Sequence, residues 1–358
     1  HQLYMQKNHG FSAYIVGGFV RDYTLGIISK DVDIATNATP KQIMDIFKTS
    51  VLPKEEYGSV TLYIKNDRFE ITTFRREIRY INNRKPIEIE YINDLLEDLK
   101  RRDFRMNTLC MDKTGRILDF FDGKKDIQQK TINTIGDSNY KFSQDSLRIL
   151  RAIRFATILD FKLSDEVKNA IIENKHLLRN LSYSRKKQEL DKIFLSNNSK
   201  YGVNLIIELG LDKDLEIFNL DRINLNNDII SIWASIDSCD NYKQEFTSSE
   251  KSIIRDVKEV VNGGINNQSL YKYGLYINQI AASILNVDKS NVVEIYEKLP
   301  IKSKKEISIT SNEIESILNR KIGSLFNDIY SDIIDKILSN KLNNTYEKIK
   351  KYILENYN

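Results

Sequence analysis

The spacing of apolar positions changes near residue 137 of the chain. Before that point, short runs in which apolar and polar residues alternate predict β-strands at residues 12–18, 31–36, 59–64 and 68–74. Only three residues separate the last two runs, so we expect these two strands to pair as a hairpin.

Helical periodicity dominates the rest of the chain. Apolar residues recur at spacings of three and four in residues 145–159, 165–178, 184–195 and 330–354. One earlier helix is expected at residues 39–47, where a threonine cap precedes a proline at the first helical position. The pattern therefore predicts an α+β fold, in which a small mixed sheet with its helices precedes an elongated all-α remainder.

Composition and charge narrow the functional class only slightly. The 358 residues are enough for two or three domains, and the formal net charge of +4 makes nucleic acid one partner to consider. The two cysteines, Cys110 and Cys239, are far apart and match neither a disulfide framework nor a zinc motif. No run of eighteen apolar residues occurs, and the first residues lack the apolar segment of a signal peptide. We expect a cytoplasmic protein without a membrane partner.

Two aspartates separated by one valine stand out in the second predicted strand. Side chains alternate faces along a strand, so Asp31 and Asp33 would project from the same side while Val32 points into the core. Two carboxylates about 7 Å apart repel one another unless a cation lies between them. A hard divalent ion such as Mg²⁺ suits this pair, and a solvent-facing pair at a strand edge is the alternative.

A glycine pair ends the first predicted strand. Backbone N–H groups at Gly17 and Gly18 would be exposed without side chains in the way, which suits phosphate oxygens. Arg21 follows within one helical turn and would add a charge-assisted contact. Neither the P-loop motif nor the dinucleotide-binding motif is present. What remains is a phosphate-binding turn beside a candidate metal pair.

These two features together carry a family resemblance. With GGFVRD at 17–22 and DVD at 31–33, the chain resembles class II tRNA nucleotidyltransferases and bacterial poly(A) polymerases. The resemblance implies a polymerase-β-like nucleotidyltransferase head, in which the glycine turn and its arginine bind the triphosphate and the aspartates hold the metal. Glu70 matches the family's third catalytic acid, with cross-strand pairing to Arg68 or Lys65 as the alternative.

A third matching segment is R-R-D-x-x-x-N. The segment begins at Arg101. The resemblance implies that three of its residues contact the ribose: Arg102, Asp103 and Asn107. A hydrogen-bond acceptor such as Asp103 suits a 2′-hydroxyl, the group that distinguishes ribonucleotides. A basic helix end capped by Asp103 is the alternative.

The fourth segment, FSQDSLRILRAIRF, contains the residues that the resemblance implies read the base. Asp145 and Arg148 are three residues apart and are expected on one helical face, with Arg151 continuing the row; an ordinary ion pair is the alternative. Aspartate only accepts and arginine only donates hydrogen bonds. Cytosine and adenine both present an amino donor beside a ring-nitrogen acceptor, so one such pair accepts both bases and rejects guanine and uracil. Arg151 and Arg154 are further candidates for the triphosphate, unless one of them pairs with Glu189.

The segment between the acidic strands and R-R-D is full length. Its polar, Arg-rich middle at 78–86 is predicted to be a mobile loop, and its presence argues against an enzyme that adds only CC.

The motifs divide the chain into a head at 1–137, a base-recognising neck at 138–200, a body at 201–295 and a tRNA-binding tail at 296–358. The function implied is template-independent addition of CCA to the 3′ end of tRNA from CTP and ATP, with Mg²⁺ and without a protein partner. An A-adding tRNA nucleotidyltransferase or a poly(A) polymerase is the first alternative. A catalytically silent RNA-binding protein is the second.

Overall fold

The computed structural model describes residues 10–29, 31–47, 51–54, 58–64, 67–81, 85–236, 246–321, 323 and 325–357. The chain divides into two compact units. The first is built mainly from His1–Leu220, and the second from Asp221–Tyr242 and Phe246–Asn358. The finer boundaries after residues 137, 200 and 295 stay predictions.

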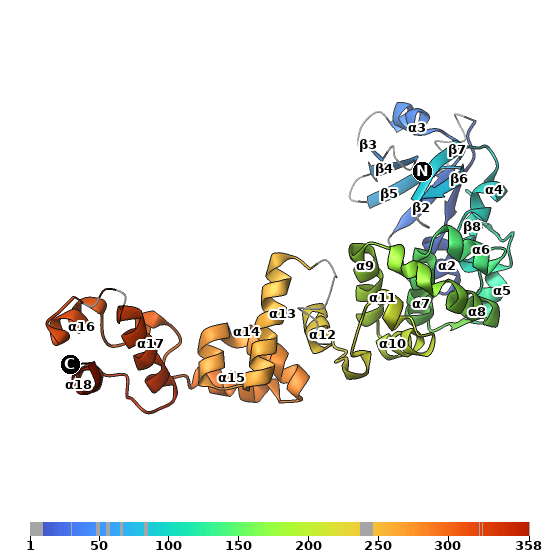
Figure 1. Ribbon diagram of the computed structural model, residues 1–358. Helices are drawn as coiled ribbons and strands as arrows, with labels where there is room; N and C mark the ends of the chain where they lie inside the picture. Colours follow the sequence, from blue (N-terminus) through green and yellow to red (C-terminus); the bar gives the residue numbers. More distant parts are fainter. Residues whose placement is uncertain are drawn as a thin grey trace. The chain divides into compact units, whose positions relative to one another are not determined.

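A seven-stranded mixed sheet forms one part of the first unit, in the order β3-β4-β5-β2-β1-β8-β9 (Figure 1). Its strands are β1 (Ala13–Val16), β2 (Val32–Thr36), β3 (Val51–Lys54), β4 (Ser59–Ile64), β5 (Asp67–Thr73), β8 (Cys110–Met111) and β9 (Ile117–Leu118). β2 runs parallel to β5 and antiparallel to β1, while β4 and β5 form the predicted antiparallel hairpin.

Helices cover both faces of this sheet because its central strand is apolar on both sides. The helices of the first unit are α2 (Gly18–Thr24), α3 (Pro40–Phe47), α4 (Leu95–Lys100), α5 (Gly123–Gln128), α6 (Ser138–Gln144), α7 (Leu147–Leu159), α8 (Asp165–Asn174), α9 (Tyr183–Phe194), α10 (Ser199–Glu208) and α11 (Asp212–Leu215). Ile34 packs in one buried cluster with Ile43 of α3, and the next residue, Ala35, packs in another with Leu99 of α4. This alternation is the period of two expected for a strand between two layers.

The segment predicted to be a mobile loop is instead part of an antiparallel ribbon. β6 (Arg75–Ile81) pairs with β7 (Lys85–Tyr91), so the prediction is wrong for every described residue between 78 and 86; residues 82–84 lie outside the description. Charged side chains on facing positions help to hold this polar ribbon, as in the 3.4 Å contact between Arg76 and Glu90.

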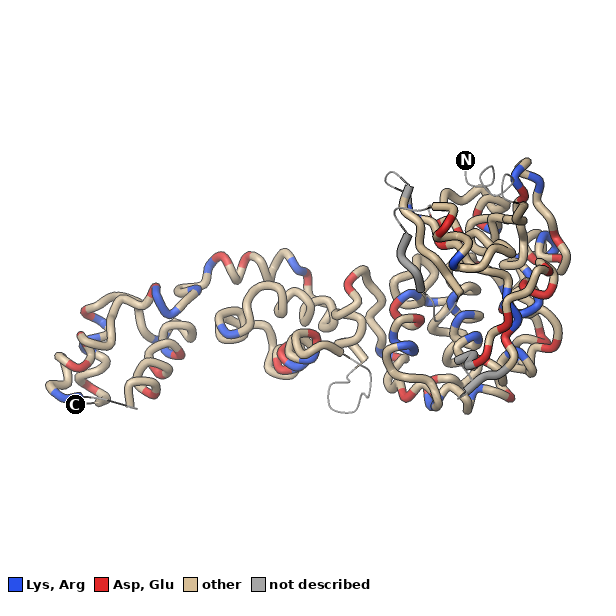
Figure 2. Tube along the Cα trace, turned by 90° about the horizontal axis from the view of Figure 1, so that it is seen from above, with Lys and Arg blue, Asp and Glu red and all other residues tan. Residues whose placement is uncertain are grey.

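Within the described residues of the second unit, the regular secondary structure is helical. Its helices are α12 (Ile229–Ser235), α13 (Ser248–Gly263), α14 (Asn267–Leu285), α15 (Lys289–Glu297), α16 (Ser311–Leu318), α17 (Leu325–Leu338) and α18 (Tyr346–Tyr357). Capping boxes begin α13, α14 and α16. Basic and acidic residues are interspersed along this unit as a whole (Figure 2). The predicted α+β class, a mixed-sheet head followed by helices, is confirmed. Within the part of the chain that is described, no helix has the length and apolar character needed to span a membrane.

The buried carboxylate of Asp126 leads to a prediction about the stability of the fold. Asp126 is 2% exposed, and its Oδ1 accepts a 2.9 Å hydrogen bond from Asn133. Its Oδ2 has no hydrogen-bond partner among the residues that the structure describes. Burial raises the pKa of Asp126 from 3.8 to about 6. The fold therefore favours the neutral carboxyl, whose contribution to stability is complete below about pH 4 and is lost as pH rises through 6.

The variant Asp126→Asn is accordingly expected to raise the free energy of unfolding by about 1–2 kcal/mol at pH 7, and to change it little at pH 4. Denaturant unfolding at the two pH values measures this, with Asp45→Asn at an exposed position of α3 as the control. A less stable Asp126→Asn protein at pH 7 would contradict the assignment.

Candidate active site

The glycine pair forms a tight turn between β1 and α2. Gly17 has φ 74° and ψ −136°, a conformation that glycine adopts freely and other residues do not, and Gly18 is the first residue of α2. A Cβ atom at Gly17 would lie 3.5 Å from an Arg102 guanidinium nitrogen and 3.8 Å from Asp33 Oδ2. The turn, the acidic strand and the R-R-D segment therefore meet at one place.

The acidic residues lie on neighbouring strands. Asp33 of β2 is in register with Glu70 of the parallel strand β5. β2 begins at Val32, one residue later than predicted, so Asp31 lies at the start of the strand and not within it. Burial raises the pKa of the Asp33 carboxyl; the negative charges of Glu70 and Asp31 raise it further, and Arg102 lowers it. Three carboxylates thus repel one another here.

These donors suit a hard divalent cation. The described residues contain no group of three His, Cys, Asp or Glu side chains that could hold a metal ion by itself. Asp31 and Asp33 nonetheless supply oxygen donors whose mutual repulsion a cation would relieve, with water and substrate phosphate as further ligands. Glu70 also lies 3.7 Å from Arg68, so the ion-pair alternative is present in the geometry.

Asp103 is the centre of the R-R-D segment's contacts. Its carboxylate accepts hydrogen bonds from Arg151 (2.7 Å), from the Phe104 backbone N–H (2.8 Å) and from Asn107 (3.2 Å). Burial alone would raise the pKa of Asp103, but the Arg151 guanidinium and these bonds hold it well below its usual range. Arg21 donates to Asn107 at 2.8 Å. Asp103 therefore does not cap a helix end, and it links the R-R-D segment to α7.

The arrangement of the base-reading segment differs from the prediction. Asp145 has φ −143° and ψ 99°, which is extended backbone between α6 and α7, so its predicted place on the helix is wrong. Arg148 and Arg151 do lie three residues apart on α7, as predicted. The Asp145 side chain instead accepts a 3.1 Å hydrogen bond from the Leu147 backbone N–H, a local turn that competes with helix. Gln144 accepts a 3.3 Å hydrogen bond from Arg148.

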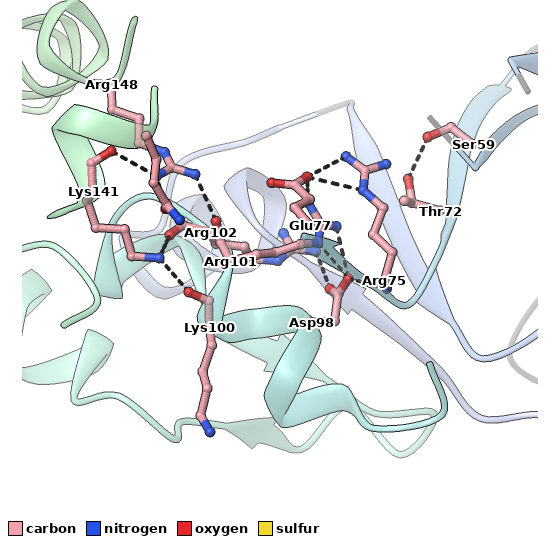
Figure 3. A network of polar contacts seen from close by, with 11 residues as sticks. Ser59, Thr72, Arg75, Glu77, Asp98, Lys100, Arg101, Arg102, Lys141 and Arg148 are labelled. Atoms are coloured by element: carbon pink, nitrogen blue, oxygen red, sulfur yellow. Dashed lines mark hydrogen bonds and ion pairs between the residues drawn. The ribbon is translucent and has the colours of Figure 1, made fainter. Parts of the chain in front are cut away.

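Backbone carbonyls of two segments fix the Arg148 guanidinium. It donates at 3.0 Å to the carbonyl of Lys141 and at 3.0 Å to the carbonyl of Arg101 (Figure 3). Lys141, which the sequence reasoning missed, donates to the carbonyls of Lys100 (2.5 Å) and Arg102 (3.2 Å). The base-reading and ribose-binding segments are therefore tied together.

A cavity of about 500 Å³ gathers most of the predicted residues. The predicted residues in its lining are Gly17, Gly18, Arg21, Asp33, Arg102, Asp103, Asn107, Asp145, Arg148 and Arg151. It also takes in Arg75, Glu77, Arg101 and Phe155, which sequence reasoning did not assign to a site.

A second cavity of about 800 Å³ adjoins the first and shares with it the lining residues Asp33, Arg75, Arg101, Arg102 and Arg151. Asp33 lines both cavities, whereas Glu70 lines only the second. Ser59 and Thr72, whose hydroxyls lie 3.0 Å apart, and Arg185 of α9 also line it.

Two predicted residues line neither cavity. Asp31 is exposed at the start of β2. Arg154 is 8% exposed and pairs with Glu189 at 3.1 Å, which is the alternative foreseen from the sequence.

An ion-pair network connects the β6–β7 ribbon with the R-R-D segment. Glu77 accepts hydrogen bonds from Arg75 (3.0 Å) and Arg101 (3.2 Å), and Arg101 also donates to Asp98 at 2.9 Å (Figure 3). Burial raises the pKa of Asp98, but Arg101 and Arg102 outweigh it and hold the pKa below its usual value. In the sequence, Glu77 is a single acidic residue among arginines. This pattern is the signal from which an ion-pair network could have been predicted.

Family models and known proteins match most of this chain. The sequence model of the Poly A polymerase head domain matches residues 13–133, and models of a polymerase A RNA-binding segment and of a tRNA nucleotidyltransferase domain match 160–215 and 238–353. The CCA-adding enzyme of Anoxybacillus flavithermus is 33% identical over 98% of this chain and 94% of its own length. That of Bacillus subtilis is 32% identical over 96% and 94%.

Solved structures show the same fold. The crystal structure of the Bacillus stearothermophilus CCA-adding enzyme in complex with CTP superimposes with a TM-score of 0.83 at 25% identity, covering 99% of this chain and 95% of that one. The Thermotoga maritima CCA-adding enzyme complexed with tRNA has a TM-score of 0.68 at 20% identity, covering 99% and 93%, and supports the fold alone. The resemblance predicted from the sequence is confirmed: the chain belongs to the tRNA nucleotidyltransferase family of CCA-adding enzymes.

Proposed function

We propose that this enzyme adds C, C and A in turn to the 3′ end of tRNA, using CTP and ATP and releasing pyrophosphate. The observation that carries the proposal is the 500 Å³ cavity, in which the glycine turn, Asp33, the R-R-D segment and the pair Asp145 and Arg148 meet. Relatives that are about one third identical over nearly the whole chain are CCA-adding enzymes, which supports the same substrates.

Different residues of the cavity would bind the triphosphate, the ribose and the base of the nucleotide. Backbone N–H groups at Gly17 and Gly18 and the Arg21 guanidinium would bind the triphosphate. Asp103, Arg102 and Asn107 would bind the ribose. Since Arg151 holds the Asp103 carboxylate ionised, that carboxylate remains a hydrogen-bond acceptor for a 2′-hydroxyl at any physiological pH.

Base choice would follow from the fixed geometry of Asp145 and Arg148. Carbonyls of Lys141 and Arg101 hold the Arg148 guanidinium in place, so the pocket is organised before the nucleotide arrives. An acceptor from Asp145 and a donor from Arg148 match the pairing edges of cytosine and adenine. Guanine and uracil would leave buried polar groups unpaired.

Enzymes of this family depend on metal ions, and we assign Mg²⁺ to this one. Asp31 and Asp33 would hold it, and when bound it lowers the pKa of the primer's 3′-hydroxyl and offsets charge on the triphosphate. Glu70 would complete the acidic set. The second cavity shares Asp33 with the first and would receive the 3′ end of the tRNA, so that the hydroxyl faces the α-phosphorus in line. We place the enzyme in the cytoplasm.

Primer extension on a sequencing gel tests the proposal. Three tRNA primers, lacking the last three, two or one of the CCA nucleotides, are incubated with Mg²⁺ and CTP, ATP or both. We expect C, C and A to be added in order, followed by arrest. Extension of only the CC-ended primer would make the enzyme A-adding, a long A ladder would make it a poly(A) polymerase, and no product would favour a silent RNA-binding protein.

A further inference from the structure

Three arginines surround one aromatic ring at the edge of the nucleotide cavity. The guanidinium carbons of Arg154, Arg21 and Arg151 lie 4.4, 5.1 and 5.4 Å from the ring centroid of Phe155. Phe155 lines the cavity and is 9% exposed. These separations are within the range of cation–π interactions.

Each arginine is also held by its own polar partner. Arg21 donates to Asp22 on its own helix, besides Asn107. Arg151 is bonded to Asp103, and Arg154 to Glu189. These partners hold each guanidinium separately, and Phe155 is the side chain that all three share.

Like charges brought this close repel one another. Burial lowers the pKa of Arg154, and the charges of Arg151 and Arg21 lower it further against the effect of Glu189. The face of an aromatic ring carries partial negative charge, so a phenylalanine between the arginines offsets repulsion that an aliphatic side chain of similar size would leave.

The ring itself is fixed by the ribose-binding segment. Phe104, which follows Asp103, packs edge-on against Phe155 with ring centroids 5.8 Å apart and an interplanar angle of 83°. The ring is therefore held between α7 and the segment that carries Asp103, Asn107 and their bonds to Arg151 and Arg21.

We propose that Phe155 is a positioning residue that holds Arg21 and Arg151 in the geometry that binds the triphosphate, with Arg154 as their buried anchor. The inference rests on the proposed function of the cavity. Phe155 has no charge and no hydrogen-bond donor, so its effect on anion binding would act through the arginines that it positions. An ordinary core residue in this position would contribute to stability and to nothing else.

Measuring the binding of pyrophosphate and of cytidine to the full-length protein distinguishes a positioning role of Phe155 from a purely structural one. Pyrophosphate probes the triphosphate site alone. Cytidine probes the ribose and base sites, where Asp103 keeps its hydrogen bonds from the Phe104 N–H and from Asn107 when the arginines shift. By calorimetry in Mg²⁺ buffer, Phe155→Leu is expected to weaken pyrophosphate binding about tenfold or more and cytidine binding less than threefold. Phe155→Tyr, which keeps the ring, is expected to bind both within threefold of wild type. In extension assays, Phe155→Leu is expected to raise KM for CTP and ATP more than it lowers kcat.

The control is Phe161→Leu, which removes the same atoms from a 1% exposed ring beyond the end of α7. Thermal unfolding of all variants calibrates the loss of stability. Equal weakening of pyrophosphate and cytidine binding in Phe155→Leu, or pyrophosphate binding unchanged from wild type, would overturn the positioning role. A wild-type protein that extends tRNA but binds no pyrophosphate would overturn it as well. Failure of the wild type to extend tRNA would instead remove the proposed function, and the binding experiment keeps the two failures apart.

Discussion

Asp33→Asn is expected to lower kcat for nucleotide addition by about 10³-fold or more, while the protein stays folded. Asp33 is the acidic residue that lines both cavities, so it lies where nucleotide and primer would meet. The amide keeps the shape of the carboxyl and removes the charge that would hold a cation and offset the developing charge of the reaction. Single-turnover extension with CTP measures the loss.

The same substitution should leave stability unchanged or raise it. Burial and the charges of Glu70 and Asp31 raise the pKa of Asp33, so the folded protein favours the neutral form of this group. Asp45→Asn, an exposed aspartate on α3, is the matched control. An Asp33→Asn protein with near wild-type kcat would remove Asp33 from the catalytic residues, whatever its stability.

Much of the site could be predicted because its residues lie in short contiguous motifs. The glycine turn, the acidic strand and the R-R-D segment each depend on local geometry, such as a strand that ends at a glycine with positive φ. That these motifs lie together in space could be predicted only from the family resemblance, because contacts such as that between Arg21 and Asn107 span 86 residues of sequence. The family and the enzyme class predicted from these motifs are confirmed.

What could not be predicted depends on tertiary contacts and on competing local turns. Asp145 was expected on a helix because the apolar spacing continues through it, but its side-chain bond to the Leu147 N–H ends one helix and starts the next. Residues 78–86 are predicted to be a loop because they offer little to bury. The backbone pairing of β6 with β7 and the ion pairs of this ribbon cannot be seen in the hydropathy pattern. The sequence analysis gives Phe155 no role, since no pattern within the helix indicates that Arg21 packs against it.

Asp145→Asn is the second substitution with a large expected effect, and it acts on specificity. An aspartate can only accept hydrogen bonds, whereas an asparagine can present either its oxygen or its amino group to a base. Discrimination between CTP and UTP, as the ratio of kcat/KM values, is therefore expected to fall about 10²-fold or more, because uracil no longer leaves a buried acceptor unpaired. Incorporation of the first nucleotide from each triphosphate measures the ratio.

Because residue 145 lies in the break between α6 and α7, this substitution should change base recognition without changing the local backbone. Asparagine retains the Oδ1 acceptor that bonds the Leu147 N–H, so the turn that presents residue 145 to the cavity should persist, and Arg148 keeps its carbonyl partners. Asp137→Asn, a change of the same kind at the exposed cap of α6, should leave the ratio unchanged. An unaltered preference for CTP in Asp145→Asn would mean that the base is read by other groups. In that case Arg148, fixed by the Lys141 and Arg101 carbonyls, becomes the residue to replace next.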